Sequence, residues 1–248
     1  NDRRAEARGG EAAGNLLAML RIYHDACAFE DVRSQAPGAI AALSGRDRIE
    51  AQVLLANALL VLRRVSEARS LREAMPPVDE AELKVELHLL DARLWCEEGR
   101  YDECCSRFDG AWLEERIRCA RTRGILRLGL VVAECHRRRN ELAAAHAGCK
   151  RVLTAAQRLD WKEGLADGLT LLALLDRMEG RWERAEALLS RALELYRETG
   201  SALGRVHATV DLGLQRLWAG KFRLALETLN DAVVLAAQLG GIQAGAMA

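Results

Sequence analysis

The feature that most constrains the fold of this chain is a short turn that returns at a nearly constant interval. Gly180 and Trp182 begin a stretch whose apolar residues fall at steps of three and four, the spacing of one helical face. Gly220 and Phe222 occupy the same positions 40 residues later, and Tyr101 lies two periods before Trp182, at a distance of 81 residues. A period between about 20 and 50 residues is the sequence signature of a solenoid of repeated units.

A small residue follows the aromatic position by three residues, and this second mark extends the alignment along the chain. The aligned pairs are Phe29 and Val32, Val65 and Ala68, Tyr101 and Cys104, Leu142 and Ala145, Trp182 and Ala185, and Phe222 and Ala225. Successive pairs are 36, 36, 41, 40 and 40 residues apart. A small side chain lets two helix backbones approach closely, while the aromatic fills the wedge at the turn. We therefore predict six units that pack through these positions and turn at glycines such as Gly180 and Gly220.

Each unit is expected to be a pair of helices, because half of the residues are hydrophobic, only 4% are aromatic and only three are proline. Asn140, Asp160 and Ser201 are expected to cap helix starts, and Pro37 to interrupt the second helix. The predicted helices cover about 12–26 and 29–43, 47–62 and 65–75, 79–97 and 101–114, 116–138 and 140–157, 160–180 and 181–199, and 201–218 and 221–238.

The composition of the two ends of the chain indicates where the folded domain begins and how it ends. Residues 1–10 are polar and expected to be loose, and residues 11–248 to form one superhelical domain, a piece of a longer protein because the chain does not begin with Met. The last stretch, 240–248, looks like the start of another helix, so the solenoid is expected to continue or to form a homodimer there. No apolar run of about 18 residues and no signal peptide is visible, which favours a cytoplasmic protein without a membrane span.

These residues make the chain similar to the tetratricopeptide repeat family. The family pattern has a Gly-x-aromatic turn, then a small residue, a large apolar residue and Ala. The matching residues are Gly180, Trp182, Ala185, Leu189 and Ala192 in the fifth unit, Gly220, Phe222, Ala225, Leu229 and Ala232 in the sixth, and Gly99, Tyr101, Cys104, Phe108 and Ala111 in the third. The resemblance implies an all-α fold, a right-handed α-solenoid of about six helical hairpins. The period exceeds the family's usual length and resembles the long repeats of bacterial activators of the LuxR type related to the maltose activator, and of sigma-54-dependent activators.

Two neighbouring stretches carry strong and opposite charge. Residues 116–139 hold eight Arg and one Glu, and residues 78–98 hold seven acids, one Lys and one Arg. In the resembled family the first helices of the units line the concave face, and repeat position then places five residues in the groove: Arg93, Arg127, Glu134, Arg137 and Arg177. One interpretation is that this groove binds a polar or acidic peptide or a small ligand, since Arg grips carboxylates in two-point contacts.

The plainer alternative is that the acidic and basic helices pair with each other and with water, which contributes little. Binding to nucleic acid is a third and weaker interpretation, because the net charge is zero and no helix-turn-helix motif is visible. The five tryptophans are assigned to packing or to groove walls, with Trp218 expected in the core.

No motif in the sequence indicates catalysis or metal binding. The seven cysteines are odd in number and lack a CxxC spacing, which favours reduced thiols over disulfides. His146 and Cys149 are three residues apart, too weak a spacing to indicate a metal site. No nucleophile elbow, P-loop, dinucleotide-binding or zinc-protease motif occurs, so no catalytic residue, metal or cofactor is predicted. The sequence thus predicts a recognition domain, either the sensor segment of a cytoplasmic bacterial regulator or a free-standing adaptor.

Overall fold

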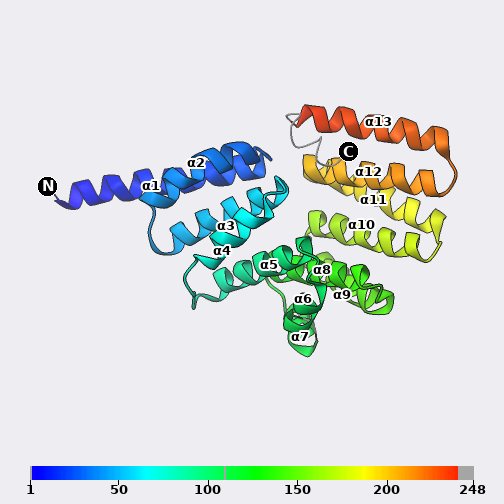
Figure 1. Cartoon of the computed structure of the whole chain (residues 1–248), viewed down its shortest axis with the longest axis horizontal. Coiled ribbons are helices and arrows are strands. Elements are labelled where there is room, and N and C mark those ends of the chain that lie inside the picture. Colours follow the sequence, from blue (N-terminus) through cyan, green and yellow to red (C-terminus); the bar gives the residue numbers. More distant parts are fainter. Residues whose placement is uncertain (1, 109, 240–248) are drawn as a thin grey trace. The chain divides into compact units, whose positions relative to one another are not determined.

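The computed structural model describes residues 2–108 and 110–239, with side chains from residue 14 onward, and every regular element in these residues is a helix. The all-α prediction is therefore confirmed. The helices are α1 (Asp2–Asp25), α2 (Phe29–Ala42), α3 (Gly45–Val61), α4 (Val65–Glu73), α5 (Ala81–Glu97), α6 (Tyr101–Phe108), α7 (Ala111–Arg118), α8 (Arg123–Arg138), α9 (Leu142–Arg158), α10 (Lys162–Met178), α11 (Trp182–Thr199), α12 (Ala202–Trp218) and α13 (Phe222–Gln238) (Figure 1).

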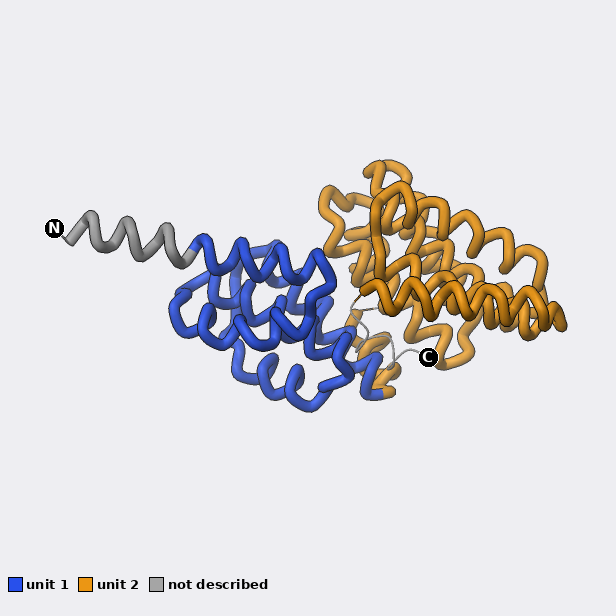
Figure 2. Tube along the Cα trace, turned by 90° about the horizontal axis from the view of Figure 1, so that it is seen from above, with its two compact units in different colours: residues 1–98 blue, residues 99–248 orange. Residues whose placement is uncertain are grey.

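The chain divides into two compact units, residues 1–98 and residues 99–248, coloured separately in Figure 2. Unit 1 holds α1 to α5 and unit 2 holds α6 to α13. The sequence predicts one domain over residues 11–248. The prediction for residues 240–248 falls outside the described residues.

The second helices of the six predicted hairpins begin within two residues of the predicted starts. These helices start at Phe29, Val65, Tyr101, Leu142, Trp182 and Phe222, the six residues that the repeat alignment places in one column. Two residues before each start, the backbone takes a positive φ: Cys27 (58°), Arg63 (61°), Gly99 (74°), Asn140 (62°), Gly180 (74°) and Gly220 (74°). The repeat in the sequence is thus the repeat of one left-handed turn.

Hydrogen bonds at the Gly180 turn show what this geometry accomplishes. The N–H of Gly180 donates to the carbonyl of Arg177 (3.1 Å), and the N–H of Arg181 donates to the carbonyl of Asp176 (2.8 Å). This pair of bonds is the Schellman motif, which satisfies the last carbonyls of a helix and requires a residue in the left-handed region. The same pair recurs at Asn140 and at Gly220.

The predicted caps are wrong at Asn140 and Asp160, and at Ser201 the position is right but the side-chain hydrogen bond is missing. Asn140 (φ 62°) and Asp160 (φ 46°) both take the left-handed conformation that ends the preceding helix, one residue earlier than a cap of α9 or α10 would lie. Asn and Asp are the residues other than Gly that tolerate this region best. Ser201 does precede α12, but its side chain makes no capping hydrogen bond.

The small residues at the third position after each helix start are all buried, which confirms their packing role. They are Val32, Ala68, Cys104, Ala145 and Ala185, each with no exposed surface, and Ala225, with 2%. The aromatic position is more variable. Tyr101 and Trp182 are half-buried, but Phe222 is 69% exposed, because α13 is the last described helix and no described helix follows it. Trp218 is 67% exposed, so the core assignment for it was wrong.

Successive helices of unit 2 pack in chain order. Each of α8 to α13 contacts the next, and the first helices of the hairpins contact each other, α8 with α10 and α10 with α12. Figure 1 shows α10 to α13 as successive antiparallel helices. Neighbour-to-neighbour packing of this kind lets every hairpin bury a face that it cannot bury alone. A core of Ala185, Leu189, Ala192, Leu193 and Leu212 joins α11 to α12.

The predicted boundaries fail in the middle of the chain and near its start. The predicted helix 101–114 ends at Phe108, where Gly110 takes a φ of 97°, and a short extra helix, α7, precedes α8. Helix α8 therefore begins at Arg123 rather than at residue 116. Pro37 lies inside α2 without ending it, and α1 is helical from Asp2, across the segment expected to be loose.

Candidate interaction face

The face of unit 2 formed by α8, α10 and α12 carries most of the predicted groove residues. The residues at two repeat positions near the helix ends are at least partly exposed and lie three residues apart, so each pair shares one side of its helix: Glu134 and Arg137 on α8, Leu174 and Arg177 on α10, and Leu214 and Leu217 on α12. Repeat position makes Glu134, Leu174 and Leu214 equivalent, and likewise Arg137, Arg177 and Leu217. We call this surface the A-helix face.

Three of the five predicted groove residues come together here. Arg137 binds Glu134 with two hydrogen bonds of 2.6 Å, one from Nε and one from Nη2, and its Nη1 approaches Met178 Sδ at 3.7 Å. Arg138 Nε donates to the same Glu134 carboxylate at 2.7 Å. Glu134 therefore binds two guanidinium groups at the end of α8. Arg177 of α10 is close enough to Arg137 for the two positive charges to repel each other.

Arg177 differs from its neighbours because its charge has no direct partner among the described residues. Within residues 14–108 and 110–239, its guanidinium forms neither an ion pair nor a hydrogen bond, and Nη1 is buried. Burial lowers the pKa of Arg177, the nearby Asp211 opposes that shift, and Arg137 adds to it. A buried donor without an acceptor costs about 1–3 kcal/mol, so this position carries a stability cost that packing alone does not explain.

Asp211 on α12 is the acidic counterpart that sequence reasoning missed. Burial raises the pKa of this carboxyl, against the attraction of Arg177 and Arg137 and together with the repulsion of Glu134. The equivalent residues one and two repeats earlier are Leu171 and Val131. An acid at a position that is apolar in the preceding repeats was the signal available in the sequence.

The other two predicted groove residues lie elsewhere. Arg127, nearer the start of α8, lies over the Trp161 ring at 5.5 Å and approaches Glu163 at 3.9 Å, a cation–π contact reinforced by a weak ion pair. Arg93 belongs to unit 1, where its Nη1 donates to Asn57 Oδ1 at 2.8 Å. Within unit 2, the structure thus brings Glu134, Arg137 and Arg177 together and gives Arg127 other contacts, while the groove position of Arg93 in unit 1 stays a prediction.

Most charges of the two biased stretches are paired inside their own units. In unit 1, acids of the 78–98 stretch pair with earlier arginines: Glu80 with Arg46, Asp91 with Arg72, Glu97 with Arg63 and Glu98 with Arg69. In unit 2, Arg118 pairs with Glu115, and Arg139 pairs with Asp102 and Glu141. Local pairing therefore accounts for much of the charge pattern, and Arg177 and Asp211 stand out against it.

A second cluster at the turn between α10 and α11 brings together His146, Asp176 and Glu179, whose ligand-type atoms lie within 4.8 Å of one another. Arg181 occupies this cluster. It donates to Asp176 Oδ1 at 2.5 Å and bonds Glu179, while Arg184 approaches Asp176 Oδ2 at 3.1 Å. Two arginines balance the two carboxylates, so the cluster is explained as an ionic link that fixes the turn.

All seven cysteines are free thiols. Cys149 is fully buried, its Sγ lies 3.1 Å from the carbonyl oxygen of Gly168, and burial raises the pKa of its thiol to about 12. A thiol with such a pKa is not a nucleophile at neutral pH. Cys119 is exposed, and its Sγ donates to Glu115 Oε1 at 3.2 Å.

Comparison with known proteins informs the fold alone. No family model and no curated protein matches the chain. Among solved structures it is similar to the crystal structure of BtubC (BKLC) from P. vanneervenii, with a TM-score of 0.55 and 17% sequence identity over 93% of both chains. Across the described helices, none is long and apolar enough to cross a membrane.

Proposed function

We propose that this chain is a non-catalytic recognition domain that binds a protein or peptide segment through the A-helix face of unit 2. The observation that carries the proposal concerns two residues of this face, Arg177 and Asp211. Both are partly buried on this face, they are opposite in charge, and neither makes an ion pair or hydrogen bond through its side chain among the described residues. Charged groups left in this state lower stability unless a partner uses them.

The chemistry of the face suggests what such a partner presents. Arg177 offers planar N–H donors suited to a carboxylate, and Asp211 offers an acceptor suited to Lys or Arg. Leu174, Leu214 and Leu217 border these charges and supply apolar surface. A segment with an acidic and a basic residue flanking apolar side chains matches both features.

In the larger setting, we propose that the chain is the sensor segment of a cytoplasmic bacterial regulator. This follows from the resemblance to long-repeat activators, in which partner binding shifts the activity of attached domains. A free-standing adaptor that assembles proteins is the second candidate, since it needs the same face and no attached domain. Nucleic acid is disfavoured because most arginines of the basic stretch already pair with acids.

Charge reversal on the face tests the proposal. Wild-type protein and the variant Arg177→Glu/Asp211→Lys are compared in affinity capture from cells of the source organism. We expect partners held by the wild type to be lost from the variant. Arg223→Glu is the matched control, because Arg223 lies on α13 with a side chain that is 87% exposed and approaches Glu227 only at 4.0 Å. A partner set that is the same for all three proteins contradicts the assignment of the face.

A further inference from the structure

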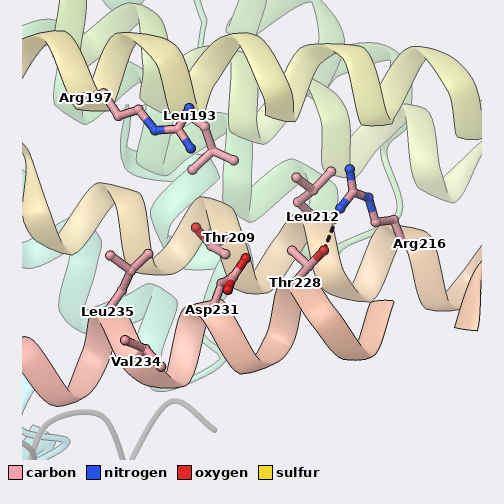
Figure 3. Close-up of a pocket in the computed structure, with 9 residues that line it drawn as sticks. All are labelled: Leu193, Arg197, Thr209, Leu212, Arg216, Thr228, Asp231, Val234 and Leu235. Atoms are coloured by element: carbon pink, nitrogen blue, oxygen red, sulfur yellow. Dashed lines mark hydrogen bonds between the residues drawn. The ribbon is translucent and has the colours of Figure 1, made fainter. Parts of the chain in front are cut away.

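A second surface feature of unit 2 is a cleft of about 420 Å³ between its last helices. Leu193 of α11, Leu212 of α12 and Leu235 of α13 give it apolar walls. Figure 3 shows that side chains from all three helices point into this space. Its volume lies in the range of about 300–1,000 Å³ that is typical of small-molecule sites.

Two leucines of the preceding repeat are replaced by threonines in the lining of the cleft. Thr209 and Thr228 line it, and one repeat earlier the equivalent residues are Leu169 and Leu188. Leu169 and Leu188 are partly buried and pack against the core of unit 2. Thr is shorter than Leu and polar, so these replacements remove apolar side-chain volume among α11, α12 and α13 and add two hydroxyl groups there.

The hydroxyl groups and one arginine of the cleft have defined partners. Thr209 Oγ1 donates to the carbonyl of Arg205 at 2.6 Å, which leaves its lone pairs free to accept. Thr228 Oγ1 donates to the carbonyl of Leu224 (2.6 Å) and accepts from Arg216 Nη1 (2.5 Å). Arg216, which also lines the cleft, is paired with Glu186 at 2.9 Å.

Two further charges in the cleft are opposite in sign and unused. Arg197 on α11 and Asp231 on α13 both line it, and neither forms an ion pair or a side-chain hydrogen bond among the described residues. Figure 3 shows Asp231 directed toward Thr209, with Arg197 on the opposite wall beside Leu193. The cleft therefore presents two hydrogen-bond acceptors, Asp231 and Thr209 Oγ1, the guanidinium donors of Arg197, and apolar walls.

We propose that this cleft binds a small zwitterion with an apolar body, of the class of free hydrophobic α-amino acids. The ammonium group donates hydrogen bonds to Asp231 and to Thr209 Oγ1, and the carboxylate accepts hydrogen bonds from the guanidinium of Arg197. The apolar side chain lies against Leu212 and Leu235. This site is separate from the A-helix face, because its polar residues, Arg197 on α11, Thr209 on α12 and Asp231 on α13, are not those of the stripe that carries Arg177.

Titration calorimetry with leucine, valine, methionine and phenylalanine at millimolar concentration tests the proposal. Isocaproate and isoamylamine serve as leucine analogues that lack the ammonium or the carboxylate. The absence of either charge-assisted hydrogen bond is expected to weaken binding by about tenfold or more. Arg197→Gln should abolish the discrimination against isoamylamine, and Asp231→Asn the discrimination against isocaproate.

Thr209→Leu is the matched variant that refills the cleft with the residue found one repeat earlier. It should raise the melting temperature and eliminate amino-acid binding, and a raised melting temperature also shows that it folds. The proposal is overturned if none of the four amino acids binds the wild type, if isocaproate binds as tightly as leucine, or if Thr209→Leu binds unchanged. Arg177→Glu should leave amino-acid binding unaffected, which separates this site from the A-helix face.

Discussion

Replacing Gly180 by Ala is expected to destabilise unit 2 although the added methyl group meets nothing. Among the residues that the structure describes, no heavy atom other than those of the adjacent residues lies within 4 Å of a Cβ built at this position, so the substitution creates no steric clash with them. The cost comes from the backbone alone, because φ is 74° and the turn needs this conformation for its two closing hydrogen bonds.

The magnitude follows from two opposing effects. An L-residue in the left-handed region costs about 1–2 kcal/mol relative to Gly. Removing a Gly from the unfolded chain offsets about 0.4–1 kcal/mol of this cost. The net loss for Gly180→Ala is about 1 kcal/mol, which corresponds to a decrease in melting temperature of about 2–4 °C for a chain of this size.

Gly38→Ala is the matched control. Gly38 lies inside α2, and a Cβ there also meets no atom of the described part of the chain within 4 Å, but its backbone is helical. This control is expected to stabilise by about 0.5–1 kcal/mol, because Ala is the better helix former. Both variants are measured by thermal and urea unfolding followed by circular dichroism. A neutral or stabilising Gly180→Ala would refute the idea that the repeat is a repeat of left-handed turns.

Four other outcomes are expected. Arg63→Gly should stabilise unit 1, because Arg63 takes a φ of 61° at the equivalent turn, and unfolding curves measure this. Tyr196→Phe should lower stability by about 0.5–1.5 kcal/mol, since the buried hydroxyl donates to an aspartate at 2.6 Å. Thiol labelling at neutral pH followed by mass spectrometry should modify Cys119 and spare Cys149, whose thiol pKa is raised to about 12. Asp211→Asn should stabilise the protein at pH 7. Burial raises the carboxyl pKa of Asp211 in the folded protein above its ordinary value of 3.8, so the stability of the wild type falls as the pH rises from 3.8 through the pKa of the folded state. Below pH 3.8 the carboxyl is protonated in both states, and the gain from Asn should vanish.

The sequence was sufficient for the hairpins because one local constraint repeats in them. The starts of all six second helices coincide with the aligned aromatic or apolar residue, and the small residue three positions later is buried each time. The failures lie where the pattern carries no such constraint. Gly110 and the segment before Arg123 break a stretch that is continuously helical by composition, so α7 was missed.

The candidate site was predictable in part, for a related reason. Repeat position placed Glu134, Arg137 and Arg177 on one face, because helices that stack in register align equivalent residues. Repeat position also assigned Arg93 of unit 1, whose side chain donates to Asn57, and that assignment stays a prediction.

Two features of unit 2 escaped sequence reasoning because neither forms a motif. Asp211 is a single acid at a position that is apolar in the preceding repeats, and a search for runs of charge overlooks it. The cleft at Thr209 was missed for the same reason, since two hydroxyl residues at leucine positions leave no recognisable pattern. Comparing each repeat with its neighbours, position by position, would have found both.

Recognition through the A-helix face can be tested by site-specific photo-cross-linking in cells. A photoreactive phenylalanine analogue replaces Leu174 on α10 or Leu214 on α12, and in a third protein Glu194 on the exposed side of α11. If this face holds a partner, Leu174 and Leu214 each give a discrete adduct with a partner protein, and Glu194 gives none. Adducts from Glu194 alone, or from none of the three positions, would contradict recognition through this face.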